Sequence, residues 1–163
     1  MSSTVKLASL AVACAASVHA EIWEALPSLP ESNGGFACAA WEDKIAVIGG
    51  TNWVGDEKRW LAVVHCYDPA GKAWTTLAPL AEPLAHPVIA ETSAGLVVAG
   101  GTTGQAPFLS SLFFKSGGME VKRGPQMTQP RVAAAGGVLG DELIVVGGTA
   151  DLANLALMRS DVV

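Results

Sequence analysis

A group of polar, charged and aromatic side chains at recurring places in the sequence is suited to ligand binding. One set follows three Gly-Gly pairs and comprises Thr51, Asn52, Trp53, Lys58, Arg59, Thr102, Thr103, Thr149 and Asp151. A second set precedes the next apolar segment and comprises Asn33, His86 and Arg131. Hydroxyl, amide, indole and cationic groups together can bind a polyol or a carboxylate-bearing sugar. For any single member, a solvated loop surface is the alternative interpretation.

The loop from Thr51 to Trp60 is the most informative part of this group. It contains two tryptophans, Trp53 and Trp60, outside the repeated anchors described below. Exposed aromatic surface of this kind usually marks a recognition site. We therefore expect ligand contacts to concentrate in this loop.

The residues provide no evident metal or cofactor site. The sequence has no CxxC motif and no Cys/His cluster, so a structural zinc site has no ligand set. The glycine pairs are not part of a GxGxxG motif and do not open a helix, so they predict no phosphate-binding loop. We expect neither a cofactor nor a metal.

Three apolar segments that each end in Gly-Gly are repeated along the sequence, and they position these residues. The segments Ile45-Ala-Val-Ile-Gly-Gly50, Leu96-Val-Val-Ala-Gly-Gly101 and Leu143-Ile-Val-Val-Gly-Gly148 are each followed by threonine, and the glycine pairs are 51 and then 47 residues apart. The anchors Trp23, Trp74 and Val121 keep the same intervals. A period near 50 residues with a strand ending in Gly-Gly is typical of kelch repeats.

Each repeat divides into four short strands separated by turn residues. In the first repeat we expect strands at 36–41, 45–48, 61–67 and 73–77. The sequence therefore predicts an all-β, kelch-type β-propeller with about 2.5 blades of four-stranded antiparallel sheet, an incomplete ring. The expected parts are a closing strand four at 21–30, blade 1 at 34–80, blade 2 at 84–127 and a partial blade 3 at 131–163.

The incomplete ring leads to two alternative expectations. Propellers close with roughly four to eight blades, so open blade edges would expose unpaired backbone and apolar faces. The sequence is then a fragment of a longer product, or it completes its ring by self-association with another copy.

The topology predicts where the candidate ligand residues meet. Strands alternate direction, so loops joining strand two to strand three and loops joining strand four to the next strand one emerge on the same face. Both sets of candidate residues should share that face.

The first twenty residues are typical of a signal peptide. Lys6 precedes an apolar run from Leu7 to Ala16, and small residues end at Ala20. A lipoprotein using Cys14 is the alternative, but Ala11 stands where leucine is expected. We expect export to a periplasmic or extracellular location.

The charge balance excludes some partners. Without Lys6, nine Lys and Arg face 15 Asp and Glu, and no Lys/Arg run exists. Such a chain lacks the electrostatic footprint for nucleic acid. No later segment is long enough to predict a membrane span.

The cysteines of the exported part are expected to stay unpaired. Cys38 falls in strand one and Cys66 in strand three, so strand two separates them. Neighbouring strands lie ~4.8 Å apart, and twice that distance exceeds the ~7 Å limit for bridging α-carbons.

The segments Asn33-Gly-Gly-Phe36, Ile48-Gly-Gly-Thr-Asn-Trp53 and Lys58-Arg-Trp60 resemble the cyclically permuted mutarotase group, kelch proteins similar to N-acetylneuraminate epimerase. Asn52 and Lys58 match the motif best. Val54 stands where the group has proline, and Leu61 and Ala62 stand where it has acidic residues.

The resemblance implies a six-bladed propeller that acts on sialic acid as a sugar mutarotase or epimerase. It also implies a catalytic glutamate after a glycine and a nearby arginine, but threonine follows all three glycine pairs here. No catalytic residue is therefore carried over. Mutarotation needs a base and an acid, and Asp151, Glu57 and His86 have no visible partners for those roles.

A second kelch chemistry, copper-radical galactose oxidation, needs two tyrosines, and the sequence has one, Tyr67. Two function classes remain open: a mutarotase or epimerase, and a noncatalytic extracytoplasmic kelch module that binds a glycan or a protein.

Overall fold

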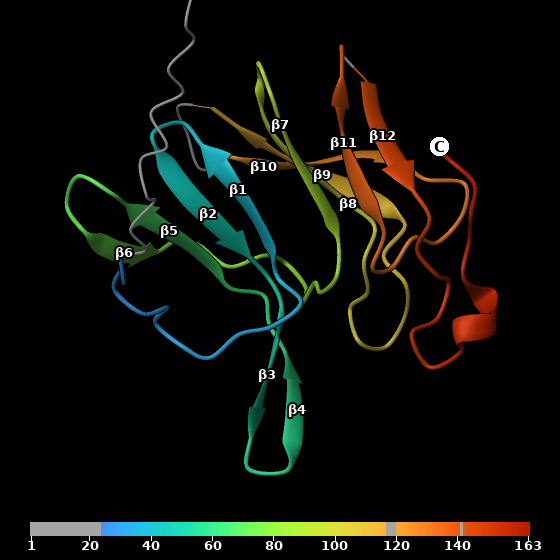
Figure 1. The fold of residues 1–163 in the computed structure, drawn as a ribbon, viewed down its shortest axis with the longest axis horizontal. Coiled ribbons are helices and arrows are strands. Elements are labelled where there is room, and N and C mark those ends of the chain that lie inside the picture. Colours follow the sequence, from blue (N-terminus) through green and yellow to red (C-terminus); the bar gives the residue numbers. More distant parts are fainter. Residues whose placement is uncertain (1–23, 117–119, 141) are drawn as a thin grey trace, which may run out of the picture.

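The computed structural model describes residues 24–116, 120–140 and 142–163 (Figure 1). The expected signal peptide over 1–20 and the anchor Trp23 lie outside the described residues. The described residues form twelve β-strands in antiparallel sheets and one short 3-10 helix, η1 (Leu155–Leu157). The all-β prediction is confirmed, and the sheets are those of a partial β-propeller. No helix of the described residues is long and apolar enough to cross a membrane.

Blade 1 is a four-stranded sheet with the order β1-β2-β5-β6. Its strands are β1 (Ala37–Trp41), β2 (Lys44–Ile48), β5 (Val64–Asp68) and β6 (Ala73–Thr76). Antiparallel registers such as Trp41 with Lys44 place a two-residue turn between β1 and β2. Asp68 shapes the last turn, since its Oδ1 accepts a hydrogen bond of 2.9 Å from the Ala70 amide.

Blade 2 repeats this arrangement with the order β10-β9-β8-β7. Its strands are β7 (Val88–Thr92), β8 (Gly95–Ala99), β9 (Ser110–Lys115) and β10 (Val121–Gln126). The third sheet contains β11 (Ala135–Leu139) and β12 (Glu142–Val146). On the free side of β12, Val145 and Val163 exchange two backbone hydrogen bonds of 2.7 and 2.9 Å. Residues near 163 therefore occupy the place that strand three takes in the other blades.

The structure corrects two expectations about the strands. The loop from Thr51 to Trp60 is a β-hairpin, β3 (Thr51–Val54) and β4 (Glu57–Trp60), which projects from the body of the molecule (Figure 1). Gly55 takes a positive φ of 61° in its two-residue turn, and Gly followed by Asp is a known hairpin signal.

The second correction concerns the expected closing strand at 21–30. Residues 24–30 form no strand, and residues 21–23 lie outside the described part. Strands β5 and β9 already pair with β6 and β10, so neither of these two strands has a free edge for the segment. The segment lies against blade 1 instead, where Trp74 Nε1 donates a 2.9 Å hydrogen bond to the Pro27 carbonyl.

The double glycines connect neighbouring blades. The Gly50 amide donates to the Leu84 carbonyl, and the Gly101 amide donates to the Arg131 carbonyl, both at 2.8 Å. A Cβ on Gly49 would lie 1.9 Å from the Leu84 carbonyl oxygen. A side chain there would separate blades 1 and 2, which explains the glycine that follows β2.

The first strands of the blades lie side by side, with β7 packed between β1 and β11. Backbone hydrogen bonds join them at one end: His86 donates to the Gly35 carbonyl at 2.6 Å, and Ala133 donates to the His86 carbonyl at 2.9 Å. The apolar core lies between blades 1 and 2, where Trp41 and Phe114 meet edge to face at 6.2 Å.

The two cysteines of blade 1 are free, as predicted. Cys38 pairs with Val47 of β2, and Cys66 pairs with Ala46 on the other side of the same strand. Because β2 lies between them, no disulfide can join the two thiols.

Candidate functional site

A repeated backbone bridge organises the candidate ligand face. Gly34 pairs with Thr51, Ala85 with Thr102, and Val132 with Thr149. Each bridge joins the residue before a first strand to the threonine after a double glycine. The two predicted sets of candidate residues are therefore neighbours on one face, as the alternation of strands requires.

On this face an open groove of about 560 Å³ lies where the β3–β4 hairpin meets a loop of blade 2 and a loop of the third sheet. Strand β4 contributes Lys58 and Trp60, the loop after β8 contributes Thr102 and residues 104–107, and the loop after β12 contributes residues 150–153. Of the predicted residues, the groove brings together Lys58, Thr102 and Asp151. We refer to it as the three-loop groove.

Trp60, the second tryptophan of the loop from Thr51 to Trp60, is one wall of the three-loop groove. The Nζ of Lys58 lies 4.4 Å from the centroid of the Trp60 ring, a distance at which a cation is attracted to an aromatic face. Both side chains project to the same side because they are two residues apart in β4. The Gly55-Asp56 turn signal would have assigned this strand and hence this shared face.

The threonine hydroxyls shape one side of the groove. Thr102 Oγ1 donates to the Ala106 carbonyl at 3.0 Å and accepts from the Gly104 amide at 3.1 Å. Thr103 Oγ1 also donates to the Ala106 carbonyl, at 3.2 Å. These hydroxyls hold the 102–106 turn, so their donor protons are not directed to a ligand.

Asp151 supplies the carboxylate of the groove. Its Oδ1 accepts a hydrogen bond of 2.9 Å from the Ala153 amide, which orients the side chain. Among the described residues nothing donates to its second oxygen. The carboxylate therefore keeps acceptor sites for a ligand hydroxyl.

His86 lies at the junction of blades 1 and 2, outside the groove lining. Its imidazole covers Gly35, where a Cβ would lie 2.4 Å from the His86 Cε1. Burial lowers the pKa of His86 below its usual value, and the positive charge of Lys58 lowers it further. The imidazole is thus held in its neutral form near pH 7.

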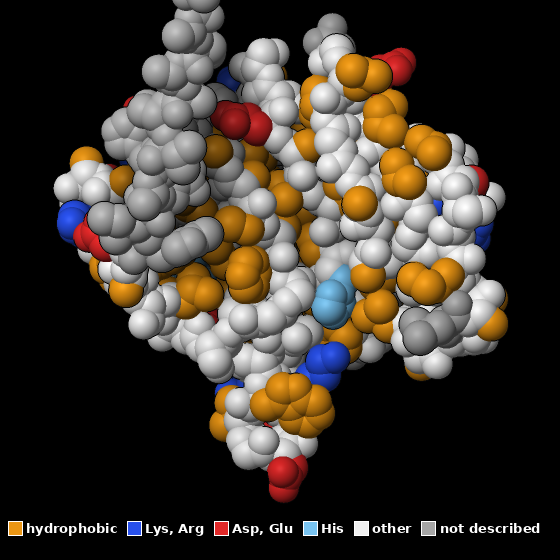
Figure 2. Space-filling model, in the orientation of Figure 1, with side chains coloured by type: hydrophobic (Ala, Val, Ile, Leu, Met, Phe, Trp, Pro, Cys, Tyr) orange, Lys and Arg blue, Asp and Glu red, His pale blue; other side chains and the backbone are white. Residues whose placement is uncertain are grey.

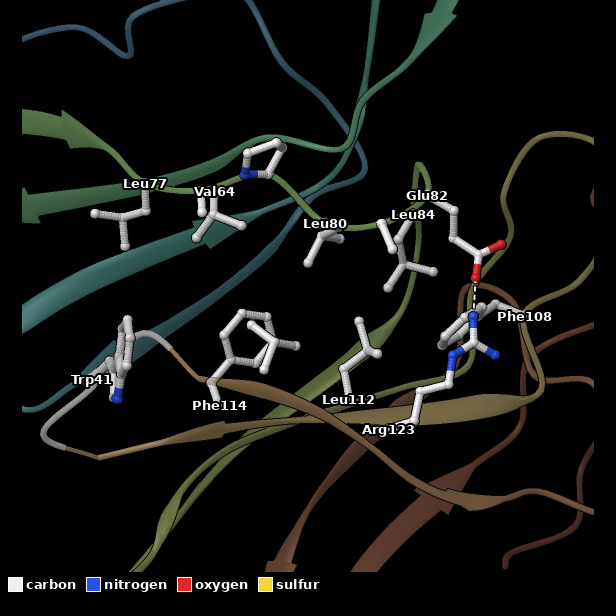
Figure 3. A pocket seen from close by; sticks show the side chains of 14 residues that line it. Trp41, Val64, Leu77, Leu80, Glu82, Leu84, Phe108, Leu112, Phe114 and Arg123 are labelled. Carbon is white, nitrogen blue, oxygen red and sulfur yellow. Dashed lines mark hydrogen bonds and ion pairs between the residues drawn. The ribbon is translucent and has the colours of Figure 1, made fainter.

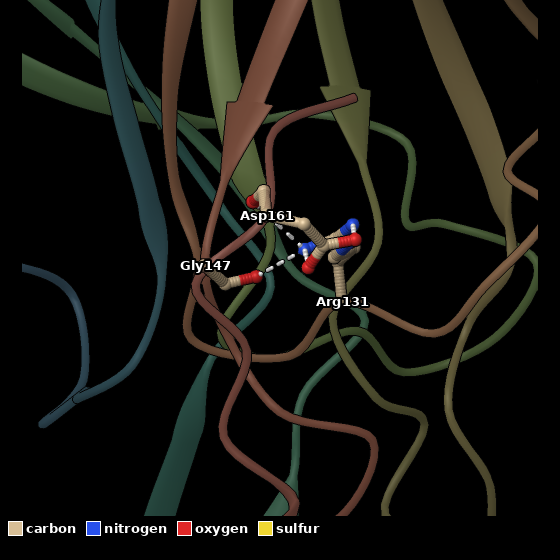
Figure 4. A network of polar contacts seen from close by, with 3 residues as sticks. All are labelled: Arg131, Gly147 and Asp161. Atoms are coloured by element: carbon tan, nitrogen blue, oxygen red, sulfur yellow. Dashed lines mark hydrogen bonds and ion pairs between the residues drawn. The ribbon is translucent and has the colours of Figure 1, made fainter.

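Arg131 is not available to a ligand, contrary to expectation. Its side chain is completely buried. Nη1 donates to the Gly147 carbonyl at 2.9 Å, and Nη2 donates to Asp161 Oδ2 at 2.8 Å (Figure 4). A buried guanidinium requires such partners, so Arg131 fixes the segment at Asp161 to the third sheet.

Three more predicted residues have structural roles. Thr149 is buried, and its hydroxyl donates to the Asp151 carbonyl at 2.9 Å. Asn33 donates a hydrogen bond of 2.8 Å from Nδ2 to the Gly49 carbonyl, which stabilises the backbone of the first Gly-Gly pair. Asn52 donates from Nδ2 to Glu31 Oε2 at 2.9 Å. The sequence alone did not show where the polar atoms of these residues are directed.

Glu31 connects the hairpin to a buried histidine that the sequence did not single out. His65 Nδ1 shares a 3.0 Å hydrogen bond with Thr76 Oγ1, and His65 Nε2 lies 3.6 Å from Glu31 Oε1. The chain of contacts from Asn52 through Glu31 and His65 to Thr76 joins the base of β3 to the outer strand β6. It anchors the hairpin to blade 1.

Trp53 and Arg59 lie on the projecting hairpin, outside the groove. Trp53 is 62% exposed, and it pairs across the hairpin with Lys58, whereas Arg59 pairs with Asn52. Figure 2 shows hydrophobic and cationic side chains along the hairpin and an acidic tip. The side chains of Trp53 and Arg59 therefore point to opposite faces of the hairpin.

The described residues contain no group of three His, Cys, Asp or Glu side chains arranged to hold a metal ion. The chemistry of the groove is that of one cation, one carboxylate and one indole. This set can bind hydroxyl groups and an apolar ring face, but it does not bring a base and an acid together.

Comparison with known proteins agrees with the fold. Residues 33–81, which contain blade 1, match the family model of the kelch motif. No match was found among curated proteins. The match covers blade 1, and the four-stranded antiparallel sheet of that blade agrees with a kelch motif.

Proposed function

We propose that the chain is a kelch module that binds a carbohydrate in the three-loop groove without catalysing a reaction. The observation that carries this proposal is the convergence of Lys58 and Trp60 from blade 1 with Asp151 from the third sheet. Residues that are far apart in the sequence line one open groove. Such convergence is the usual arrangement of a ligand site on a rigid scaffold.

The chemistry of the groove favours a sugar over a protein segment. Asp151 offers acceptor sites for hydroxyl donors, and Lys58 offers donors for hydroxyl or carboxylate oxygens. Trp60 and Pro107 provide apolar surface for the carbon face of a sugar ring. A glycan uses all of these groups at once. A protein partner is the alternative, and it would use the exposed Trp53 as an anchor.

Mutarotase or epimerase activity on a sialic acid is the second candidate. It is supported by the resemblance of the segment from Gly34 to Trp60 and by the neutral imidazole of His86, which can accept a proton. The candidate acid Asp151 lines the groove and His86 does not. Noncatalytic binding is therefore the better supported function.

Ligand-observed nuclear magnetic resonance with a panel of neutral and acidic saccharides, followed by calorimetry, tests the binding proposal. Asp151→Asn should weaken the best ligand about tenfold, equivalent to about 1.4 kcal/mol, because the carboxylate acceptor is lost. Arg59→Gln is the matched control, since Arg59 lies on the other face of the hairpin. Failure of every saccharide to bind, or equal weakening by both variants, would contradict the proposal.

Exchange spectroscopy of the N-acetylneuraminate anomers separates the two candidates. A noncatalytic module leaves the exchange rate equal to that of buffer. Acceleration that is lost in His86→Gln would instead establish catalysis by this chain.

Export is part of the same proposal and rests on the sequence pattern around Lys6 and the apolar run from Leu7 to Ala16. Expression of the full chain in a bacterial host should give a processed product that begins at Glu21. N-terminal sequencing of the periplasmic and cytoplasmic fractions checks this, and an unprocessed cytoplasmic product would overturn it.

A further inference from the structure

A second cavity lies between blades 1 and 2, and its lining is more apolar than that of the three-loop groove. It has a volume of about 340 Å³, which is within the usual range for small-molecule pockets. One wall is the segment 77–84 that follows β6, and the other is formed by β9 and β10 (Figure 3). We refer to it as the inter-blade cavity.

The walls of the inter-blade cavity are almost entirely apolar. Leu77, Leu80 and Leu84 face Leu112 and Phe114 across the space (Figure 3). At one end Trp41 and Phe114 meet edge to face, and both are buried. A cavity with such walls does not retain ordered water, and apolar molecules can occupy it.

The opposite end carries the charged side chains of the lining. Glu82 accepts a hydrogen bond from Arg123 Nη2, and the Arg123 guanidinium lies 5.5 Å from the centroid of the Phe108 ring (Figure 3). Both charged side chains are substantially exposed, so this end faces solvent. Arg123 has five N–H donors. Among the described residues its hydrogen-bond partners are Glu82 and the Ser110 hydroxyl, so donors remain for a ligand.

We propose that the inter-blade cavity binds a small, uncharged, mainly apolar molecule with a hydrogen-bond acceptor at one end. The apolar body lies between the leucines of the 77–84 segment and Leu112. The acceptor meets the free donors of Arg123 at the mouth. The ligand is uncharged because Glu82 and Arg123 already neutralise each other, so an added charge would remain uncompensated beside the apolar walls.

The neutral fluorophore 6-propionyl-2-dimethylaminonaphthalene is a suitable probe, since it has a flat apolar body and one ketone acceptor. Titration of the full chain should give a saturable, blue-shifted emission with one probe per chain. Leu112→Trp fills the cavity and should weaken binding at least tenfold. Leu109→Trp is the matched control, because Leu109 is exposed and outside the cavity lining, and it should leave binding unchanged.

Two further measurements do not depend on the variants. Nuclear Overhauser effects in the wild-type complex should connect probe ring protons with the methyl groups of Leu80 and Leu112. The anionic analogue 1-anilinonaphthalene-8-sulfonate should bind more weakly than the neutral probe. The proposal is overturned if emission does not saturate, if Leu112→Trp binds like Leu109→Trp, or if the probe contacts only methyl groups outside the cavity.

Discussion

Trp60 of the hairpin lies against Gly104 of the neighbouring blade. A Cβ on Gly104 would be 2.4 Å from Cδ2 of the indole, and Gly104 has a positive φ of 92°. This contact is the point at which the projecting hairpin meets the loop of blade 2. It fixes one wall of the three-loop groove.

Gly104→Ala should disrupt the contact between Trp60 and the loop at position 104. The new methyl group collides with the indole, and alanine is strained at positive φ, so we expect a loss of about 2 kcal/mol in the free energy of unfolding. The hairpin should also become more mobile, because the Trp60 ring can no longer pack against the backbone at position 104. Denaturant unfolding and amide hydrogen exchange of β3 and β4 measure these effects.

Gly34→Ala is the control for that substitution. A Cβ on Gly34 has no atom within 4 Å, and its φ is not positive. Its free energy of unfolding should change by less than about 0.5 kcal/mol. Equal effects of the two variants would show that the indole contact does not stabilise the hairpin.

Asp161→Asn should destabilise the protein in a pH-dependent manner. The hydrogen bond from Arg131 is the main cause that lowers the pKa of Asp161 below its usual value. A depressed folded-state pKa gives stability that is present above the unfolded-state pKa and is lost as the pH falls through the folded-state pKa. The melting temperature of the variant should therefore be lower than that of the wild type at pH 7, and the difference should shrink in acid.

Thermal melts of both proteins between pH 7 and the acid limit of folding test this prediction. Glu142→Gln, at an exposed position in β12, controls for the loss of one negative charge. A difference between Asp161→Asn and wild type that is constant with pH would show that the Asp161 charge does not act through Arg131.

The repeat made most of the blade architecture predictable. Fixed intervals between Gly-Gly pairs specify where each strand two ends, and the turn residues around Asp68 specify the remaining strand boundaries. The hairpin β3–β4 was missed because the repeat contains no counterpart of it. The local sequence does indicate the hairpin through the Gly55-Asp56 turn. The intervals between repeats carry no information about this turn.

The candidate site was predicted only in part, for a physical reason. Topology specifies which residues share a face, but the direction of a side chain depends on neighbours that are distant in sequence. Arg131 turns inward because Asp161, which lies 30 residues later, accepts its hydrogen bonds. Trp60 enters the groove because Gly104 of the next blade leaves room for its ring. Neither relationship is visible in the local sequence.

Lys58→Gln should raise the pKa of His86. Burial is the main cause of the lowered pKa, and the positive charge of Lys58 is the second. Removing that charge stabilises the imidazolium, so the titration midpoint should shift upward while burial keeps it below the usual value. The chemical shift of the His86 Cε1 proton as a function of pH reports the midpoint. In Arg59→Gln the midpoint should not move, and an upward shift of equal size there would contradict a specific effect of Lys58.

The two blade 1 thiols should react at different rates. The Cys38 residue is solvent-accessible and Cys66 is buried. Partial desolvation of the Cys38 thiol and desolvation of the Cys66 thiol raise the pKa of both groups. At pH 8 in native buffer, iodoacetamide should modify Cys38 slowly, since the thiolate is the reactive form. Cys66 should react only after denaturation. Peptide mapping by mass spectrometry measures both rates, and recovery of a Cys38–Cys66 disulfide would refute the strand order of blade 1.

Ala133→Gly should stabilise the protein. Ala133 has a positive φ of 53°, whereas the corresponding position of blade 1 is occupied by Gly35 with a φ of 66°. The left-handed conformation costs a non-glycine residue about 1 to 2 kcal/mol, and the greater freedom of glycine in the unfolded chain offsets part of the relief. A net gain of about 0.5 to 1 kcal/mol in the free energy of unfolding should remain. Ala135→Gly is the control two residues later, in β11 with ordinary φ, and it should lose about 0.5 to 1 kcal/mol. Chemical denaturation of the three proteins gives both differences, and a loss of stability in Ala133→Gly would mean that the Ala133 side chain contributes more than its backbone strain costs.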